Sequence, residues 1–241
     1  MSNEPKSNTS EFLSMRPRPH NMPFYTAKTS ILGSVKEAVT RFHGTVLDVG
    51  CGVMPYRELI TEVEAVDRYL GMDLAGSELY GHVEPDIVWD GHQIPLRDAE
   101  VDCVLATEFL EHHSDPGRIL AEIKRVMRDG GKFFATVPFV WNLHEIPHDE
   151  YRYTPYSLRR LLEEVGFKNI EIKALGGWNM SLAQMIGLWT TFSQQRPIVR
   201  KFLSLAVFPI FWLLVKTDVR PIDFDGKENS MFTGLSITAT K

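Results

Sequence analysis

Short apolar runs alternate with amphipathic stretches along most of the chain. The runs predict seven strands, at 45–49, 68–74, 85–90, 101–107, 132–139, 167–175 and 233–241. Apolar residues at helical spacing predict helices at 25–42, 55–66, 115–127 and 154–165. Strands that alternate with helices in this way indicate an α/β fold with a doubly wound, mainly parallel sheet.

Local signals set the ends of these elements. Pro55 and Pro155 stand at first helical positions, Thr154 is an N-cap, and the Arg-Asp-Gly-Gly stretch at 128–131 stops a helix. Residues 1–23 are polar and punctuated by proline, which predicts a flexible N-terminal arm. Residues 24–241 are predicted to form a single domain.

One stretch, at about 182–216, departs from the alternation and is predicted to be an apolar helical insertion before the last strand. Residues 202–215 carry no charge, but fourteen residues are too few to span a bilayer, and Pro209 would kink a helix there. Because the apolar residues fall on all sides, something must cover them. Protein is the preferred cover: the domain's own core, an acceptor lid or a homodimer mate. The alternative is a membrane surface in contact with residues 198–216, with Arg200, Lys201 and Lys216 at the headgroups and Trp212 among the apolar residues.

Charge and cysteine usage narrow the choice of partner and compartment. The 241 residues carry a net charge of −5, which offers no basic footprint for a nucleic acid. Cys51 and Cys103 are too far apart for a Cys-x-x-Cys site, and a reducing compartment is the simplest interpretation. Residues 1–15 contain no apolar signal segment, so we expect a cytoplasmic protein. If residues 198–216 contact a membrane, we expect a peripheral protein at its inner face.

The first predicted strand ends in an acid and a glycine-rich turn, Asp48-Val49-Gly50-Cys51-Gly52. No Walker sequence is present, and Pro55 stands where a dinucleotide fingerprint has its third glycine. The turn therefore lacks the features that hold phosphates, and a nicotinamide oxidoreductase is a remote alternative.

Two further acids follow the second and third strands. Asp48 suits an amine, Asp73 can accept from both ribose hydroxyls, and Asp90 can accept from an adenine amine. Each acid alone could simply cap a turn or a helix. Three acids at the tips of three successive strands favour a ligand with amine, ribose and adenine, which describes S-adenosylmethionine.

The motifs VLDVGCG, YLGMDL, DGHQIPL, VDCVLATEFLEHHSDPGRILAEIKRVMRDGGKFFATVPF and FTGLSITATK follow one another from Thr45 onward. In this order and spacing the chain resembles class I S-adenosylmethionine-dependent methyltransferases, over Thr45 to Leu175 and the last ten residues. The turn, with Val53, Met54 and Pro55 where the family usually continues with a small residue, resembles the type 11 branch that acts on sugars and glycoconjugates.

The resemblance implies a fold and a cofactor site. The fold is a Rossmann-like seven-stranded sheet of order 3-2-1-4-5-7-6, with strand seven antiparallel and helices on both faces. The implied residues for S-adenosyl-L-methionine lie at successive strand tips: Asp48, Gly50, Cys51, Gly52, Asp73, Leu74, Asp90, Gly91, Thr107 and Glu108.

The segment after the fifth strand, residues 144–154, reads HEIPHDEYRYT and concentrates groups that can handle a hydroxyl acceptor. His148, or else His144, is the candidate base, and Asp149 can fix the tautomer of a histidine. The candidate substrate-binding residues are Glu145, Arg152 and Tyr153, with His112 placed on the acceptor side by the resemblance. Alternatively, this polar group only fastens the loop to the following helix. No metal site is predicted.

The segment 144–154 also resembles a signature of methyltransferases encoded among polysaccharide and lipopolysaccharide assembly enzymes. We therefore expect O-methylation of a sugar or a lipid-linked glycan. A methyltransferase for a small molecule or lipid, such as a quinone or polyketide, is a second hypothesis. A non-catalytic interaction module with the nucleotide fold is the third, and cofactor binding discriminates against it.

Overall fold

The computed structural model describes residues 14–74, 83–220, 224 and 230–241. Its strands are β1 (Gly44–Val49), β2 (Val66–Leu74), β3 (Ile87–Trp89), β4 (Val101–Thr107), β5 (Met127–Pro138), β6 (Lys168–Leu175) and β7 (Gly234–Thr240). The helices are α2 (Met22–Val39), α3 (Arg57–Thr61), η2 (Leu110–His112), α4 (Pro116–Val126), α5 (Pro155–Val165), α6 (Trp178–Phe192) and α7 (Pro197–Lys216).

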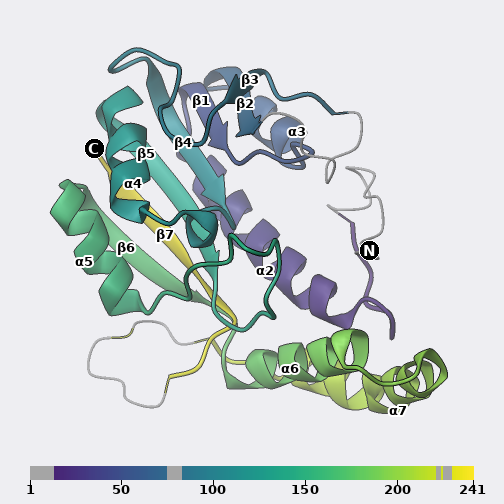
Figure 1. The fold of residues 1–241 in the computed structure, drawn as a ribbon. Helices are drawn as coiled ribbons and strands as arrows, with labels where there is room; N and C mark the ends of the chain where they lie inside the picture. Colours follow the sequence, from purple (N-terminus) through teal and green to yellow (C-terminus); the bar gives the residue numbers. More distant parts are fainter. Residues whose placement is uncertain (1–13, 75–82, 221–223, 225–229) are drawn as a thin grey trace.

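The seven strands form one sheet of order β3-β2-β1-β4-β5-β7-β6, which confirms the predicted topology (Figure 1). β7 runs antiparallel to both of its neighbours, β5 and β6, whereas the other pairs are parallel. The chain order reverses between β1 and β4, and in such sheets ligands bind outside the carboxyl ends of the strands at this switch point. The tips of β1, β2, β4 and β5 are therefore where a ligand site is expected.

The two faces of the sheet are covered by different helices. On one face, Leu47 and Phe133 of the strands belong to the core cluster that includes Ile119 of α4 and Leu158 of α5. On the other face, the cluster around Val46 includes α2 and α3 residues. Alternate positions along each strand supply the two clusters, as the pleat of a strand requires.

Two predicted helix boundaries shift in the structure. The helix predicted from residue 25 begins at Met22, whose side chain is fully buried. The helix predicted at 55–66 covers only Arg57–Thr61. The chain turns back immediately afterwards, with the Val66 amide donating to the Val63 carbonyl, because β2 has to start at Val66 beside β1.

The apolar insertion consists of α6 and α7, which pack against each other, while α6 also packs on α2 (Figure 1). α7 has 20 residues, passes through Pro209, and is longer than the uncharged stretch in the sequence. Its most apolar 18 residues have a mean hydropathy of 2.0, so by length and composition the helix could cross a membrane. Only Ser204 and Phe211 of this helix are buried. The domain's own core, one of the covers expected from the sequence, therefore does not enclose α7.

Candidate functional site

The turn after β1 brings its glycines and Asp48 against the neighbouring elements. Gly50 has a φ of +70°, and a Cβ there would lie 2.7 Å from the Phe109 ring, so only glycine fits. Asp48 is buried and accepts a hydrogen bond from the Tyr69 hydroxyl through Oδ2. Its other oxygen, Oδ1, has no partner among the described residues. Burial raises the pKa of Asp48 to about 7, although the Tyr69 hydrogen bond opposes the shift.

Asp73, at the tip of β2, is held beside the same turn. Its Oδ2 accepts from the Gly52 amide at 2.8 Å, and its Oδ1 accepts from the Leu74 amide at 2.7 Å. Burial raises the pKa of Asp73. Both oxygens keep a lone pair for a ligand hydroxyl, because a carboxylate oxygen can accept more than one hydrogen bond.

The remaining residues implied for the cofactor are placed differently. Asp90 is exposed and caps its own loop, accepting from the amides of His92 and Gln93, and Gly91 follows with a φ of +80°. Leu74 is 49% exposed beyond Asp73. Cys51 is buried in the turn, where burial raises the pKa of its thiol. In this structure Asp90 therefore caps its own loop, which was the simpler interpretation of an isolated acid.

Two glutamates follow β4: Glu111 is buried and Glu108 is half-buried, and no Lys or Arg of the described residues forms an ion pair with either. Thr107 ends the strand, and Glu108 has a left-handed φ of +49°, a conformation that costs free energy and is frequent at functional sites. The Thr136 hydroxyl of β5 donates to Glu108 Oε1 at 2.8 Å. Burial raises the pKa of Glu108 to about 7, and burial together with the charge of Glu108 raises the pKa of Glu111.

The loop after β5 is organised around Asp149, whose side chain is 2% exposed. Arg152 donates to both of its oxygens, at 2.6 and 2.8 Å, and His144 Nδ1 lies 3.2 Å from Oδ2. Burial alone would raise the pKa of Asp149, but the hydrogen bonds from Arg152 and the His144 amide lower it to about 2.

The structure therefore pairs His144 with Asp149, whereas the sequence favoured His148 as the base. The His148 side chain is exposed. The His148 backbone carbonyl accepts a hydrogen bond from Nδ1 of His112 at 3.1 Å. The difference arises because Glu145, with a φ of +48°, begins a tight turn closed by the His148 amide and the Glu145 carbonyl. This turn directs the His144 ring toward Asp149.

The same loop is fastened to η2, and this is the structural role of Tyr153. Its hydroxyl donates to the Leu110 carbonyl at 3.2 Å, and its ring is buried. The side chain that was predicted to bind substrate is therefore turned into the protein. The Glu111 carbonyl accepts from the amides of Glu150 and Tyr151. The loop after β5 is therefore fastened to η2, and it also carries the polar side chains of His144 and Glu145 beside His112.

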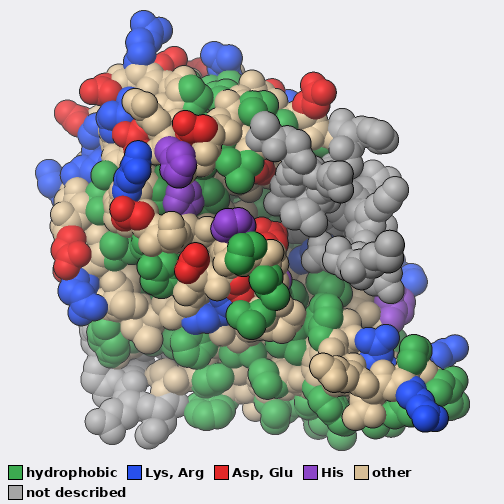
Figure 2. Space-filling model, viewed as in Figure 1, with side chains coloured by type: hydrophobic (Ala, Val, Ile, Leu, Met, Phe, Trp, Pro, Cys, Tyr) green, Lys and Arg blue, Asp and Glu red, His purple; other side chains and the backbone are tan. Residues whose placement is uncertain are grey.

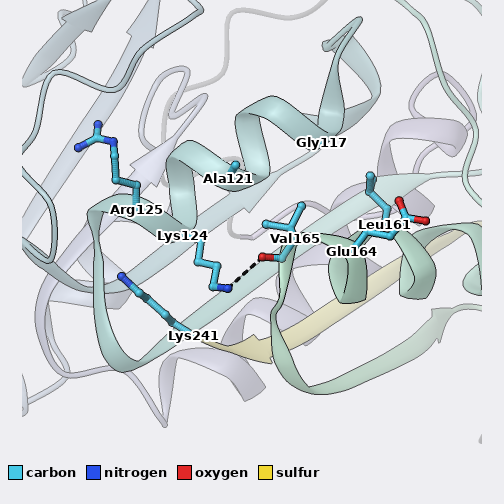
Figure 3. A pocket seen from close by; sticks show the side chains of 8 residues that line it. All are labelled: Gly117, Ala121, Lys124, Arg125, Leu161, Glu164, Val165 and Lys241. Atoms are coloured by element: carbon cyan, nitrogen blue, oxygen red, sulfur yellow. Dashed lines mark hydrogen bonds between the residues drawn. The ribbon is translucent and has the colours of Figure 1, made fainter.

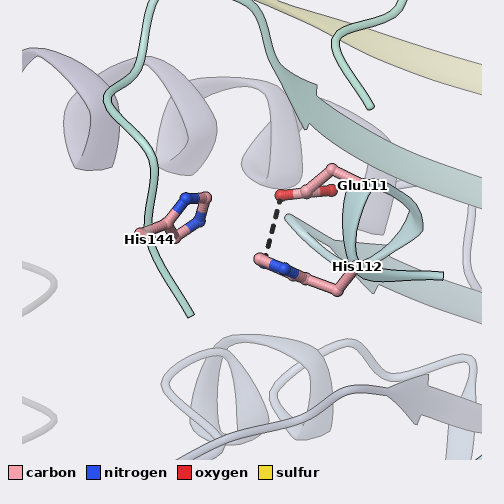
Figure 4. Close-up of side chains that lie close together, drawn as sticks. All are labelled: Glu111, His112 and His144. Carbon is pink, nitrogen blue, oxygen red and sulfur yellow. Dashed lines mark ion pairs between the residues drawn. The ribbon is translucent and has the colours of Figure 1, made fainter. Parts of the chain in front are cut away.

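Glu111, His112 and His144 come together although the sequence predicted no metal site. One ligand atom from each lies within 4.8 Å of the others, and Figure 4 shows the three side chains directed toward one another from η2 and the loop after β5. His112 Nε2 is 3.8 Å from Glu111 Oε1 and 3.8 Å from Glu145 Oε2. The sequence could not reveal this cluster, because β5 separates its two halves along the chain.

A cavity elsewhere in the molecule contains none of the predicted site residues. It has a volume of about 570 Å³ and lies between α4 and α5 (Figure 3). Lys124 at its wall donates to the Val165 carbonyl, Arg125 pairs with Glu122 and Asp98, and Lys241 donates to the Met127 carbonyl. The cationic groups of this cavity are therefore already engaged with partners of the same chain.

The strand tips fit S-adenosylmethionine. The ligand carries an ammonium and a sulfonium, and the described part of the site offers buried carboxylates, including the unpartnered Oδ1 of Asp48. The tight Gly50 turn lets the backbone approach a ligand that has no phosphate. Residues 47–135 also match the family model described as a methyltransferase domain.

Over this part of its length the chain is therefore similar to S-adenosylmethionine-dependent methyltransferases.

Individual relatives agree with this assignment of the methyltransferase domain. The chain is 31% identical over 140 residues to a probable S-adenosylmethionine-dependent methyltransferase of Mycolicibacterium smegmatis, covering 51% of each chain. It is 26% identical over 155 residues to the ubiquinone/menaquinone biosynthesis C-methyltransferase UbiE of Caulobacter vibrioides, covering 51% of this chain and 61% of that relative. The chain thus spans between half and two thirds of the length of these two relatives.

A solved structure extends the similarity of fold beyond the methyltransferase domain match. A SAM-dependent methyltransferase from Archaeoglobus fulgidus superposes with a TM-score of 0.55 at 16% identity, covering 90% of this chain and 94% of that one. At this level of identity the comparison shows the fold, and the acceptor has to be argued from the site.

The buried Asp48 carboxyl generates a prediction about pH. Its pKa rises from 3.8 in a free side chain to about 7 in the folded protein, so between these values the unfolded chain releases a proton that the folded chain retains. This contribution to stability is present at low pH and is lost as pH rises toward 7. We expect the free energy of unfolding of Asp48→Asn to fall less than that of the wild type between pH 5 and 8, by about 2 kcal/mol.

Urea denaturation at the two pH values measures this difference. The matched control is Asp129→Asn, which removes a fully exposed carboxylate and should keep the wild-type pH dependence. Equal pH dependence in Asp48→Asn and the wild type would show that Asp48 is ionised in the folded protein at pH 5.

Proposed function

We propose that the protein is an S-adenosylmethionine-dependent O-methyltransferase whose acceptor is a hydroxyl of a sugar or a lipid-linked glycan. The observation that carries the proposal is the pair of imidazoles beside the tips of β4 and β5. Both rings have Nδ1 engaged, His112 with the His148 carbonyl and His144 with Asp149. Each therefore presents Nε2 to the same space, next to Glu111.

Bound S-adenosylmethionine supplies an electrophilic methyl group whose leaving thioether is neutral, so the protein's main task is alignment. In this proposal Asp48 binds the amine of the methionine part, and Asp73 binds the ribose hydroxyls. A hydroxyl acceptor has to lose its proton during transfer, and His144, oriented by Asp149, is the histidine on which this step depends.

A sugar acceptor suits the loop after β5 because it offers donors and acceptors within a few ångströms. Glu145 is partly exposed beside His112, and Arg152, fixed by Asp149, borders the same loop. Vicinal hydroxyls both donate and accept, so they match such mixed groups better than an apolar ring would.

A specific set of contacts also favours the second hypothesis, a small apolar acceptor. The Trp141 ring packs edge to face against the rings of His144 and Phe24, with centroids 6.5 and 5.9 Å apart. Phe24 packs in the same way against Phe192 of α6, with centroids 6.0 Å apart. These aromatic rings lead from the imidazoles toward α6. The Caulobacter relative is named as a ubiquinone/menaquinone biosynthesis C-methyltransferase, which agrees with an apolar acceptor. A lipid-linked glycan would use both the polar groups and this aromatic path.

Binding of the cofactor separates both enzyme hypotheses from a non-catalytic module. We expect Asp73→Ala to abolish S-adenosylmethionine binding in isothermal titration calorimetry, because the ribose hydroxyls lose their acceptor. Asp67→Ala, an exposed substitution on the same strand, is the control and should bind like the wild type. If the wild type itself shows no binding, the interaction-module hypothesis takes first place.

The choice of histidine can be tested by methyl transfer. Tritiated methyl transfer into fractionated cell envelope, compared with soluble extract, should label the envelope fraction. His144→Ala should lower the rate by about 10²–10⁴-fold, and His148→Ala only a few-fold, because His148 contributes its carbonyl and not its ring. His20→Ala, an exposed histidine before α2, is the control. A larger loss in His148→Ala than in His144→Ala would restore His148 as the base.

A lipid-linked acceptor would place the enzyme at a membrane, and the α6–α7 pair supports this. Large apolar side chains of both helices are exposed: Trp178, Leu182, Met185, Trp189, Phe192, Ile198, Val199, Phe202, Leu205, Ile210 and Leu213. Residues 178–217 contain no acid but four cations, in a chain of net charge −5. Figure 2 shows hydrophobic side chains along this edge of the molecule, with Lys and Arg at one end. This charge suits an anionic lipid surface.

Co-sedimentation with vesicles that contain anionic phosphatidylglycerol tests this contact. The double variant Phe202→Ser/Leu213→Ser should bind the vesicles about tenfold or more weakly, because each residue loses apolar area that would be buried in the interface. Val88→Ser, an equally exposed apolar residue on β3, is the control and should bind like the wild type. If the wild type does not bind vesicles but forms a dimer, and the double serine variant does not dimerise, this surface contacts a second copy of the chain instead.

A further inference from the structure

The cluster of Glu111, His112 and His144 has the composition and the order of a metal-binding site. His112 and Glu111 come from η2, at the tip of β4, while His144 and Glu145 come from the loop after β5 (Figure 4). Two imidazoles and one or two carboxylates are a ligand set for first-row divalent transition metals.

The tautomers of both histidines are set by their surroundings. His112 Nδ1 faces a carbonyl oxygen, which can only accept, so Nδ1 carries the proton. His144 Nδ1 faces the Asp149 carboxylate, which Arg152 keeps in place, so the same holds there. In a neutral ring the lone pair is then on Nε2, and in both residues a hydrogen bond on the far nitrogen orients the ring, as metal-ligating histidines usually require.

The buried carboxylate of Glu111 is the second, independent observation. Its side chain has no exposed area, and neither oxygen has a hydrogen-bond partner in the described part of the chain. A carboxylate removed from water without a partner is costly, and a bound cation would remove that cost. Glu108, which is half-buried, adds a second carboxyl group close to Glu111.

The backbone holds this arrangement in place without a ligand. The Glu111 carbonyl accepts from the amides of Glu150 and Tyr151, and the Tyr153 hydroxyl donates to Leu110, so η2 and the loop after β5 move as one unit. Metal bonds of about 2.1 Å require ligand atoms about 3 Å apart, so ligand atoms that lie within 4.8 Å of one another need to approach by up to about 2 Å.

The geometry points to a divalent transition-metal site formed by Glu111, Nε2 of His112 and Nε2 of His144, with Glu145 as a fourth ligand. Resting on the proposed function, the cation would take the acceptor oxygen as a further ligand and so orient the hydroxyl at the transferable methyl. With Nε2 bound to the cation, His144 would act as a ligand and not as the base. The cation would make the bound hydroxyl more acidic, and the hydroxyl proton would pass to the free oxygen of the Glu145 carboxylate.

The test uses the full chain after removal of metals by chelation, with Co²⁺ as the probe. We expect one equivalent of Co²⁺ to bind, with visible absorption bands, and Mn²⁺ to compete with it. Glu111→Gln, His112→Ala and His144→Ala should each weaken binding at least tenfold. Asp149→Asn, which acts through His144 as a positioning residue, should weaken binding about 10–100-fold and alter the Co²⁺ bands. His20→Ala should bind as the wild type does.

The outcomes separate this proposal from the proposed function. The metal site is overturned if His144→Ala and Glu111→Gln bind Co²⁺ as well as the wild type does. It is also overturned if the wild type binds S-adenosylmethionine but no Co²⁺. Neither result contradicts the proposed methyltransferase function. Binding of Co²⁺ that the variants lose supports the site even if no acceptor is methylated. Circular dichroism and the melting temperature of each variant establish that a loss does not come from unfolding.

Discussion

Buried negative charge at the carboxyl edge of the sheet governs the rest of this molecule. Asp48 and Glu111 are buried and Glu108 is half-buried at the tips of β1 and β4, and no Lys or Arg of the described residues forms an ion pair with them. Their pKa values rise because burial disfavours the charged form, and the protein gives up stability to keep them there. A cationic ligand recovers that free energy, which gives the edge a preference for a sulfonium, an ammonium or a metal ion over a phosphate.

One cation near this edge, Arg152, serves a different purpose. Arg152 is committed to both oxygens of Asp149, so it lowers the pKa of that carboxyl and leaves the glutamates unneutralised. Asp149 in turn orients His144. The polar side chains here therefore form two groups. Arg152 and Asp149 hold the loop and the His144 ring in place, and His144 also lies beside His112 and Glu111 in a second cluster.

The sequence predicted the sheet well and the site only in part, for physical reasons. β4 matches its predicted limits because a buried strand is a continuous apolar run, and the strand order followed from motifs in a known order. Asp90 could not be assigned from position alone, because an acid after a strand caps a loop as readily as it binds a ligand. His144 and His148 both lie near Asp149 in sequence, and only the left-handed backbone at Glu145 decides which ring faces it. The cluster with His112 depends on contacts across β5, which periodicity does not report.

The insertion of α6 and α7 enters and leaves the sheet at one point. Leu175, the last residue of β6, is paired with Gly234, the first residue of β7, so the chain departs and returns between two bonded neighbours. A short hairpin would connect these strands equally well. Because the pair is attached to the sheet at this single place, its length and polarity can change without altering the register of the seven strands.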